Sequence, residues 1–198
     1  MNRTTHRASA AARPRIGRII PGYTVPVINE REARAAAGLL FLPGIVLYLN
    51  AVHTGSADPL KPFGAVFVLD MLIRVLAGDR FAPSLALARM IVARQQPEWV
   101  GASQKMFAWW LGYSMGLAAC LATGILQAPL WVTLILCGVC LTFLFLETAF
   151  GICVGCRLQS LFSRTPPQYC AGGTCEMPDA TVPVPEPPTR SQITPSVD

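Results

Sequence analysis

A chain of 198 residues in which 53% are hydrophobic and only 14% are charged is too apolar for an ordinary soluble domain. Its formal net charge of +5 could suit nucleic acid or an anionic membrane surface, but most of the arginines flank apolar runs. The composition therefore favours a membrane protein and argues against a nucleic-acid partner. Only two histidines are present, His6 and His53, so histidine-based metal or acid–base sites are not expected.

Both ends of the chain have the composition of disordered tails. Residues 1–19 carry five arginines among Ala, Ser and Thr and lack the central apolar block of a signal peptide. Residues 177–198 are rich in Pro, Thr and Ser and contain few residues able to form a core. We expect a membrane domain over residues 20–164 and a cysteine-bearing segment over residues 165–176.

The first predicted membrane helix covers residues 33–52. An extended stretch with two prolines precedes it, and Asn29 followed by Glu32 forms a capping-box pattern that opens a helix. The apolar run is close to the ~20 residues that a bilayer requires. Pro43 and Gly44 are placed to kink the helix.

The second predicted span, residues 60–78, contains two charged residues. Asp70 and Arg74 are four positions apart and so lie on one helical face, where each neutralises the other. Burying either alone in lipid would cost roughly 2.5–3.5 kcal/mol on insertion scales, so the pair should face protein. In residues 83–96, Leu85, Leu87, Met90 and Ile91 alternate with arginines, which fits either an in-plane surface helix or a helix packed on the bundle.

The third and fourth predicted spans, residues 106–127 and 130–151, are separated by a short connection and form an antiparallel hairpin. Small residues recur every four positions along the third span, which allows a neighbouring helix to approach closely: Gly112, Gly116, Cys120 and Gly124. The glycines of this ridge are candidates for helix-mediated oligomerisation. Cys120, like Cys137 and Cys140 in the fourth span, is interpreted as a packing residue, with an intramembrane redox pair of the latter two as the alternative.

The fold class expected is therefore all-α: a polytopic membrane protein with four transmembrane helices in a compact bundle and disordered termini. Basic residues concentrate before the first span, between the second and third, and after the fourth. By the positive-inside rule, both termini and the central connection face the cytoplasm.

Glu147, near the inner end of the fourth span, is costly in lipid unless it is paired or protonated. The expected depths of the helices place it within reach of Arg74, so Asp70, Arg74 and Glu147 are predicted to form an intramembrane polar network. Such a network either fixes the packing of the helices or provides a proton or substrate path for a small transporter.

Two cysteine pairs follow the fourth span, Cys153-x2-Cys156 and Cys170-x4-Cys175. On the cytoplasmic side structural disulfides are uncommon, so the spacing suggests thiol exchange or metal ligation. In the first case Cys153 and Cys156 are the exchanging pair, the other two are accessory thiols, and Arg157 stabilises the thiolate of Cys156. In the second case all four cysteines bind zinc. The third reading is that a CxxC at an apolar helix end is a chance packing feature.

Four strings of residues resemble one protein family: GYTVPVINEREAR at 22–34, RQQPEWVGASQK at 94–105, FGICVGC at 150–156 and CAGGTCE at 170–176. This is the bacterial membrane family labelled domain of unknown function 4395, and the likeness covers about residues 20–176. It implies a small helical protein of the bacterial cytoplasmic membrane without established activity, with relatives suggested to associate with thioredoxin-like or sulfur-handling proteins. Ala171 replaces a proline of the family's Cys-Pro-Gly-Gly ending, which affects the expected turn and not the cysteines.

The function expected is thiol redox or sulfur relay at the inner face of the membrane, with a thioredoxin-like protein or a sulfurtransferase as partner. The alternatives are a zinc-binding membrane protein and a transporter or scaffold subunit built on Asp70, Arg74 and Glu147. The exchange reaction requires no cofactor, and zinc belongs only to the alternative. Whether the chain is an enzyme is left open by its residues.

Overall fold

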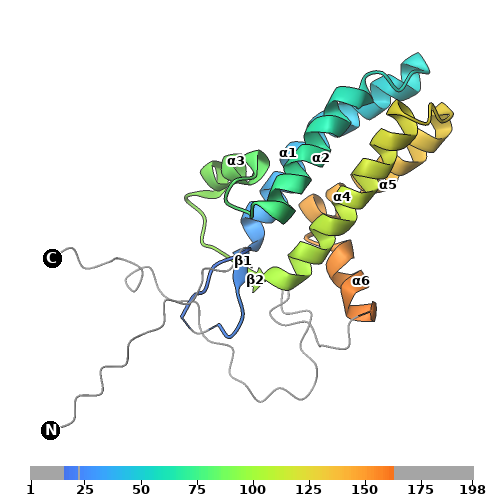
Figure 1. The fold of residues 1–198 in the computed structure, drawn as a ribbon. Coiled ribbons are helices and arrows are strands. Elements are labelled where there is room, and N and C mark those ends of the chain that lie inside the picture. Colours follow the sequence, from blue (N-terminus) through green and yellow to red (C-terminus); the bar gives the residue numbers. More distant parts are fainter. Residues whose placement is uncertain (1–15, 22, 163–198) are drawn as a thin grey trace, which may run out of the picture.

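The computed structural model describes residues 16–21 and 23–162, and this part of the chain is mostly helical. Four long helices run alongside one another, and the shorter elements gather at one end of them (Figure 1). In chain order the elements are β1 (Val27–Asn29), α1 (Glu30–Thr54), α2 (Leu60–Leu76), α3 (Pro83–Val92), β2 (Trp99–Gly101), α4 (Ala102–Gly124), α5 (Leu130–Phe150) and α6 (Val154–Phe162).

Helix α1 begins where the sequence predicts. Asn29 is the N-cap, and its side-chain oxygen accepts a hydrogen bond from the N–H of Arg31 at 3.2 Å. The amide of Asn29 donates to Glu32 Oε1 at 3.3 Å, so the two residues of the predicted capping box do contact each other. The helix starts at Glu30, three residues before the predicted span, because the cap acts on its first turn.

The two short strands decide how the helices are arranged. β1 and β2 pair antiparallel, with Val27 opposite Gly101 and Asn29 opposite Trp99. Each strand leads directly into a long helix, so the pairing holds the starts of α1 and α4 at the same end of the molecule. Helix α2 must therefore return the chain to that end after α1, and α5 must do the same after α4.

The ridge of small residues on α4 is used within the chain. A side-chain carbon at Gly116 would lie 2.8 Å from Phe67 Cδ1, so only glycine lets α2 approach this closely. A carbon at Gly112 would lie 3.9 Å from Met71 Sδ, whereas one at Gly124 would meet nothing within 4 Å. Two of the three glycines thus face α2, and oligomerisation through the ridge stays a prediction.

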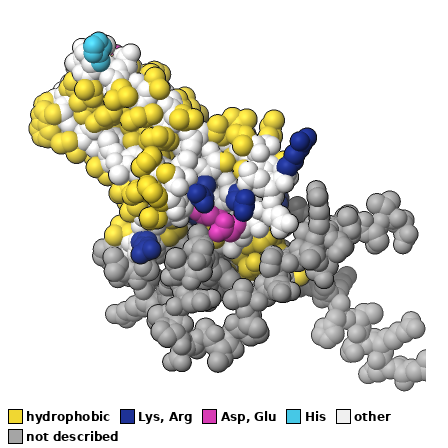
Figure 2. Space-filling model, turned by 180° about the vertical axis from the view of Figure 1, so that it is seen from behind, with side chains coloured by type: hydrophobic (Ala, Val, Ile, Leu, Met, Phe, Trp, Pro, Cys, Tyr) yellow, Lys and Arg dark blue, Asp and Glu magenta, His cyan; other side chains and the backbone are white. Residues whose placement is uncertain are grey.

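Within the described part of the chain, three helices, α1, α4 and α5, are long and apolar enough to cross a membrane. Helix α2 has 17 residues and is shorter than the predicted span of 60–78, because its C-terminal turn closes at Ala77 and Gly78. Hydrophobic side chains cover the visible face of the long helices, and the Lys, Arg, Asp and Glu side chains lie toward one end of it (Figure 2).

Two features differ from the sequence-based expectation. The two-stranded sheet was not expected in an all-α fold, since three-residue strands leave no alternating pattern to detect. Residues 16–18, assigned to the N-terminal tail, are placed: Ile16 is buried, Gly17 donates its N–H to Asp79, and Arg18 bridges to Val27. The cysteine-bearing segment of 165–176 and the tail of 177–198 lie outside the described residues.

Candidate functional site

The C-terminal end of α5 positions the first cysteine pair. Gly151 ends the helix in a left-handed conformation with φ of 67°, and its N–H donates to the Glu147 carbonyl at 3.1 Å. The Arg34 guanidinium of α1 donates to the Thr148 carbonyl at 3.3 Å and so satisfies another acceptor at this helix end. The chain then turns, and Cys153 lies directly before α6.

Cys153 and Cys156 form a disulfide, with their Cα atoms 5.2 Å apart. The N–H of Cys156 also donates to Cys153 Sγ at 3.3 Å, and the N–H of Arg157 donates to the Cys153 carbonyl at 3.1 Å. Cys153 therefore occupies the position of an N-cap residue, with its sulfur at the start of the helix. Helix N-termini favour negative charge, which is why exchange-active thiolates are often found there.

Close packing holds this disulfide against the bundle. A side-chain carbon at Gly155, between the two cysteines, would lie 2.6 Å from both Cα and Cβ of Ala108 on α4. Only glycine allows so short a distance between α6 and α4. The middle of the CxxC sequence is thus a packing contact, and the position of the disulfide is fixed by α4.

A cavity of about 60 Å³ lies beside the disulfide. A cavity needs about 10–15 Å³ of such space to hold one water molecule, so this one is large enough for water. Its lining includes Cys153 from the α5–α6 connection, Arg74 from α2, Trp109 from α4 and Glu147 from α5. Cys153 and two charged residues therefore border one small space whose lining is otherwise mostly apolar.

Glu147 pairs with a lysine that the sequence did not single out as buried. Lys105 Nζ lies 2.7 Å from Glu147 Oε1 and 2.8 Å from Glu30 Oε2, and the Lys105 side chain is only 2% exposed. The cluster joins the starts of α1 and α4 to the end of α5. It contains two carboxylates and one ammonium group, so its formal charge is −1 when all three are ionised.

The Asp70–Arg74 pair is confirmed as a contact within the protein interior. Arg74 Nε donates to Asp70 Oδ2 at 2.8 Å, and both side chains are almost fully buried. Ser84 of α3 completes the group: its N–H donates to Asp70 Oδ1 at 3.0 Å, and its hydroxyl accepts from Arg74 Nη2 at 2.6 Å. The guanidinium carbon also lies 5.5 Å from the centroid of the Trp109 ring, a cation–π contact.

The predicted three-residue network is therefore divided in two. Asp70 and Arg74 pair as expected, but Glu147 pairs with Lys105 and not with Arg74. The physical reason is that the Arg74 guanidinium already donates hydrogen bonds to Asp70 and Ser84, while Lys105 points toward the last turn of α5. A signal for Lys105 was present in the sequence, since it is four residues before Trp109 and seven before Gly112, on the face of α4 that packs inward.

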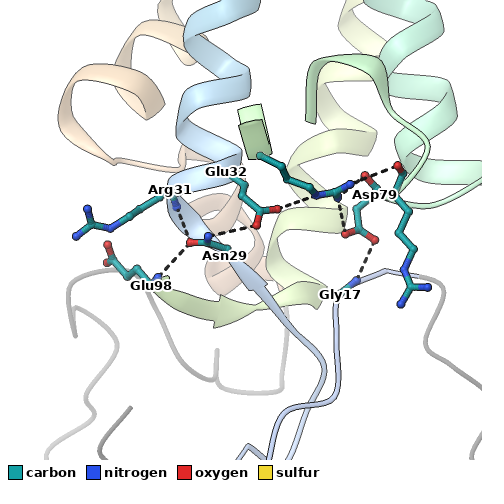
Figure 3. Close-up of polar contacts among 8 residues, drawn as sticks. Gly17, Asn29, Arg31, Glu32, Asp79 and Glu98 are labelled. Carbon is teal, nitrogen blue, oxygen red and sulfur yellow. Dashed lines mark hydrogen bonds and ion pairs between the residues drawn. The ribbon is translucent and has the colours of Figure 1, made fainter. Parts of the chain in front are cut away.

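A third polar group ties α3 and the strands to the start of α1 (Figure 3). Asn29 Oδ1 accepts hydrogen bonds from the N–H groups of Arg31 and Glu98. Arg89 of α3 reaches Glu32 at 3.0 Å and Asp79 at 3.2 Å. These contacts join α3, the strands and the start of α1 at the end of the bundle where α6 begins.

The remaining predicted site residues are placed as follows. Cys120, Cys137 and Cys140 are free and partly buried. The Arg157 side chain is exposed on α6, and its action on Cys156 stays a prediction. Cys170 and Cys175 lie outside the described residues, so the predicted zinc site is incomplete in the part described. Within that part, no group of three or more His, Cys, Asp or Glu residues is arranged to hold a metal ion.

Comparison with known proteins agrees with the resemblance in the sequence. A family model described as "Domain of unknown function (DUF4395)" matches residues 28–164. This match includes all of the helices α1 to α6 and both residues of the disulfide. The chain matches no curated protein and no solved structure.

Proposed function

For a chain that belongs to the DUF4395 family, to which no function is assigned, we propose a multi-pass membrane protein that exchanges thiols and disulfides through Cys153 and Cys156. The proposal extends to sulfur relay by the same pair, with Cys170 and Cys175 as the accessory thiols. The partner is a thioredoxin-like dithiol protein for thiol exchange, or a sulfurtransferase for sulfur relay.

The membrane part of the proposal counts α2 as a fourth span. At ~1.5 Å per residue, its 17 residues cover about 26 Å, slightly less than a typical hydrocarbon core of ~30 Å. The β1–β2 pairing supports this count, because α2 must return the chain between the starts of α1 and α4. Both termini then lie on one side, which the distribution of arginines assigns to the cytoplasm of the inner membrane.

The observation that carries the exchange function is the disulfide at the start of α6, where Cys153 borders a mostly apolar cavity that Arg74 and Glu147 also reach. Here Cys153 accepts an N–H from Cys156, and the same N–H favours the Cys153 thiolate once the disulfide is broken. Glu147 and Arg74 border the cavity and are placed to interact with water that enters it.

The exchange itself needs no cofactor. A thiolate of the partner attacks Cys156 Sγ, the S–S bond breaks, and its electron pair moves to Cys153 Sγ. The second thiol of the partner then attacks the mixed disulfide and releases Cys156 as a thiol. The partner loses two electrons and two protons and becomes a disulfide, while Cys153 and Cys156 become a dithiol. The same steps in reverse oxidise Cys153 and Cys156 again.

The experiment uses the full-length protein in lipid nanodiscs equilibrated with mixtures of reduced and oxidised dithiothreitol. Free thiols are alkylated at each ratio, and mass spectrometry quantifies the label on Cys153 and Cys156. We expect the two residues to change together from protected to labelled at one ratio. A Cys120→Ser variant is the matched control, because that thiol is remote from the pair, and it should titrate at the same ratio.

Two results would contradict the proposal. One is that Cys153 and Cys156 are fully labelled in the absence of reductant even after the protein has been treated with an oxidant. The other is a pair that no dithiothreitol concentration reduces in the folded protein. Zinc retained by the reduced protein and lost from a Cys170→Ser, Cys175→Ser variant would favour the metal-binding alternative instead.

A further inference from the structure

Helix α3 has an inner face that packs on the bundle. Its buried residues are Ser84, Leu85, Ala88 and Val92, which recur at helical spacing and contact α1. Of the two interpretations that the sequence left open for this segment, packing on the bundle is therefore correct for this face.

The outward face of α3 is apolar as well. Met90 is 74% exposed, Ile91 55% and Leu87 47%, and Phe81 just before the helix is 70% exposed. A helix on a water-facing surface carries polar residues on its outer side. Between Pro83 and Val92 the polar residues are Ser84, which is buried, and Arg89. Arg89 turns inward to Glu32 and Asp79, so it does not cover the exposed apolar residues.

The charge around this face is positive. Arg80, which precedes the helix, and Arg94, which follows it, are both exposed. The acidic groups that pair with Arg89 of α3, Glu32 and Asp79, are largely buried. Exposed apolar residues flanked by arginines match the surface of an anionic lipid leaflet, where acyl chains lie beneath negatively charged headgroups.

The position of α3 agrees with a lipid surface as the occupant. The helix lies beside α1 toward the end that carries the strands (Figure 1). The charged side chains visible in Figure 2 also lie toward one end of the long helices, where a membrane-spanning bundle meets the headgroup region. Helix α1 also exposes apolar residues farther along its length, such as Val46.

We propose that α3 is an interfacial helix that binds an anionic lipid leaflet, with Phe81, Leu87, Met90 and Ile91 among the acyl chains and Arg80 and Arg94 at the phosphates. The inference rests on the membrane location in the proposed function and is independent of the cysteines. It anchors the end of the molecule that carries the disulfide at the membrane surface.

The test places the photoreactive residue benzoylphenylalanine at single positions of the full-length protein in nanodiscs of phosphatidylcholine and phosphatidylglycerol. Met90→benzoylphenylalanine probes the outward face of α3. Val46→benzoylphenylalanine, on the exposed side of α1, reports membrane insertion itself, and Gln96→benzoylphenylalanine is the exposed polar control. After irradiation, intact-mass spectrometry counts lipid adducts and identifies the lipid.

We expect the yield of lipid adducts at Met90 to approach that at Val46 and to exceed that at Gln96 at least fivefold. Phosphatidylglycerol should be over-represented among the Met90 adducts, and Arg80→Gln with Arg94→Gln should remove that bias. Three results would overturn this inference and leave the membrane location intact. They are a Met90 yield as low as that of Gln96 while Val46 reacts, crosslinking of Met90 to a second copy of the chain, and the absence of any bias toward phosphatidylglycerol. No adducts at Val46 would overturn the membrane location and the inference with it.

Discussion

Two buried ion clusters lie near the disulfide, and they are built differently. Asp70 and Arg74 come from consecutive turns of α2, and Ser84 supplies hydrogen bonds to both, so charge and hydrogen bonding are balanced. Lys105 instead gathers Glu30 from α1 and Glu147 from α5, and the group carries one carboxylate in excess. The first cluster joins α2 to the adjacent helix α3, whereas the second joins three long helices.

The comparison shows which buried charges a sequence reveals. An i,i+4 pair such as Asp70 and Arg74 is visible because one helix brings the partners together. Lys105 and its two partners are separated by 75 and 42 positions, so their contact depends on the complete fold. Both clusters reach the cavity beside Cys153, the first through Arg74 and the second through Glu147.

The largest effect is expected at the centre of the second cluster. Lys105→Met would leave two buried carboxylates without a counter-charge, and breaking a buried pair in this way costs about 3–5 kcal/mol. The measurement is the thermal unfolding midpoint in detergent. Adding Glu30→Gln and Glu147→Gln to Lys105→Met should recover much of the loss. No loss for Lys105→Met alone would show that Lys105 is not the shared partner.

Arg74→Met should cost somewhat less, about 3 kcal/mol, because one buried carboxylate loses its counter-charge and Ser84 still donates to it. Asp70→Asn with Arg74→Met is the matched double variant and should be more stable than Arg74→Met. The same thermal midpoint reports both. A larger loss for Arg74→Met than for Lys105→Met would reverse the ranking of the two clusters.

Removing either carboxylate from Lys105 should have a smaller effect, since the ammonium keeps one partner. We expect Glu30→Gln and Glu147→Gln each to lower the free energy of unfolding by about 1–2 kcal/mol. The two variants differ in the site, because Glu147 lines the cavity beside Cys153. Under the exchange proposal, Glu147→Gln alters the rate of disulfide reduction by dithiothreitol more than Glu30→Gln does. Equal reduction rates in the two variants would show that Glu147 has no role in the exchange.

The smallest effect is expected at the exposed pair Asp58–Lys61, which serves as the reference outside the bundle. Lys61 donates to Asp58 at 2.6 Å, and this hydrogen bond holds the pKa of Asp58 below its ordinary value of 3.8. The contribution is present above pH 3.8 and is lost as the pH falls through the lowered pKa. Asp58→Asn should leave the midpoint at pH 7 unchanged, because exposed pairs contribute little. A shift as large as that of Glu147→Gln would contradict this.

Much of the fold could be predicted from the sequence because its signals are local. The cap at Asn29, the apolar runs and the Asp70–Arg74 spacing each depend on neighbouring residues. The β1–β2 pairing and the Lys105 cluster could not, because both join segments more than 40 positions apart. At the candidate site, the spacing of Cys153 and Cys156 predicted their contact. Their place against Ala108 and beside Glu147 required the packing of α6 on α4 and α5.

The central claim is that Cys153 and Cys156 change redox state in the cell. Mass spectrometry of the cysteines from acid-quenched cells, alkylated without reduction, tests it most directly, and reports Cys170 and Cys175 in the same spectra. We expect a substantial fraction of Cys153 and Cys156 as a disulfide, mixed disulfide or persulfide, which a dithiol converts to labelled thiols at both residues together. Recovery of all four cysteines as unmodified, freely alkylated thiols would contradict it.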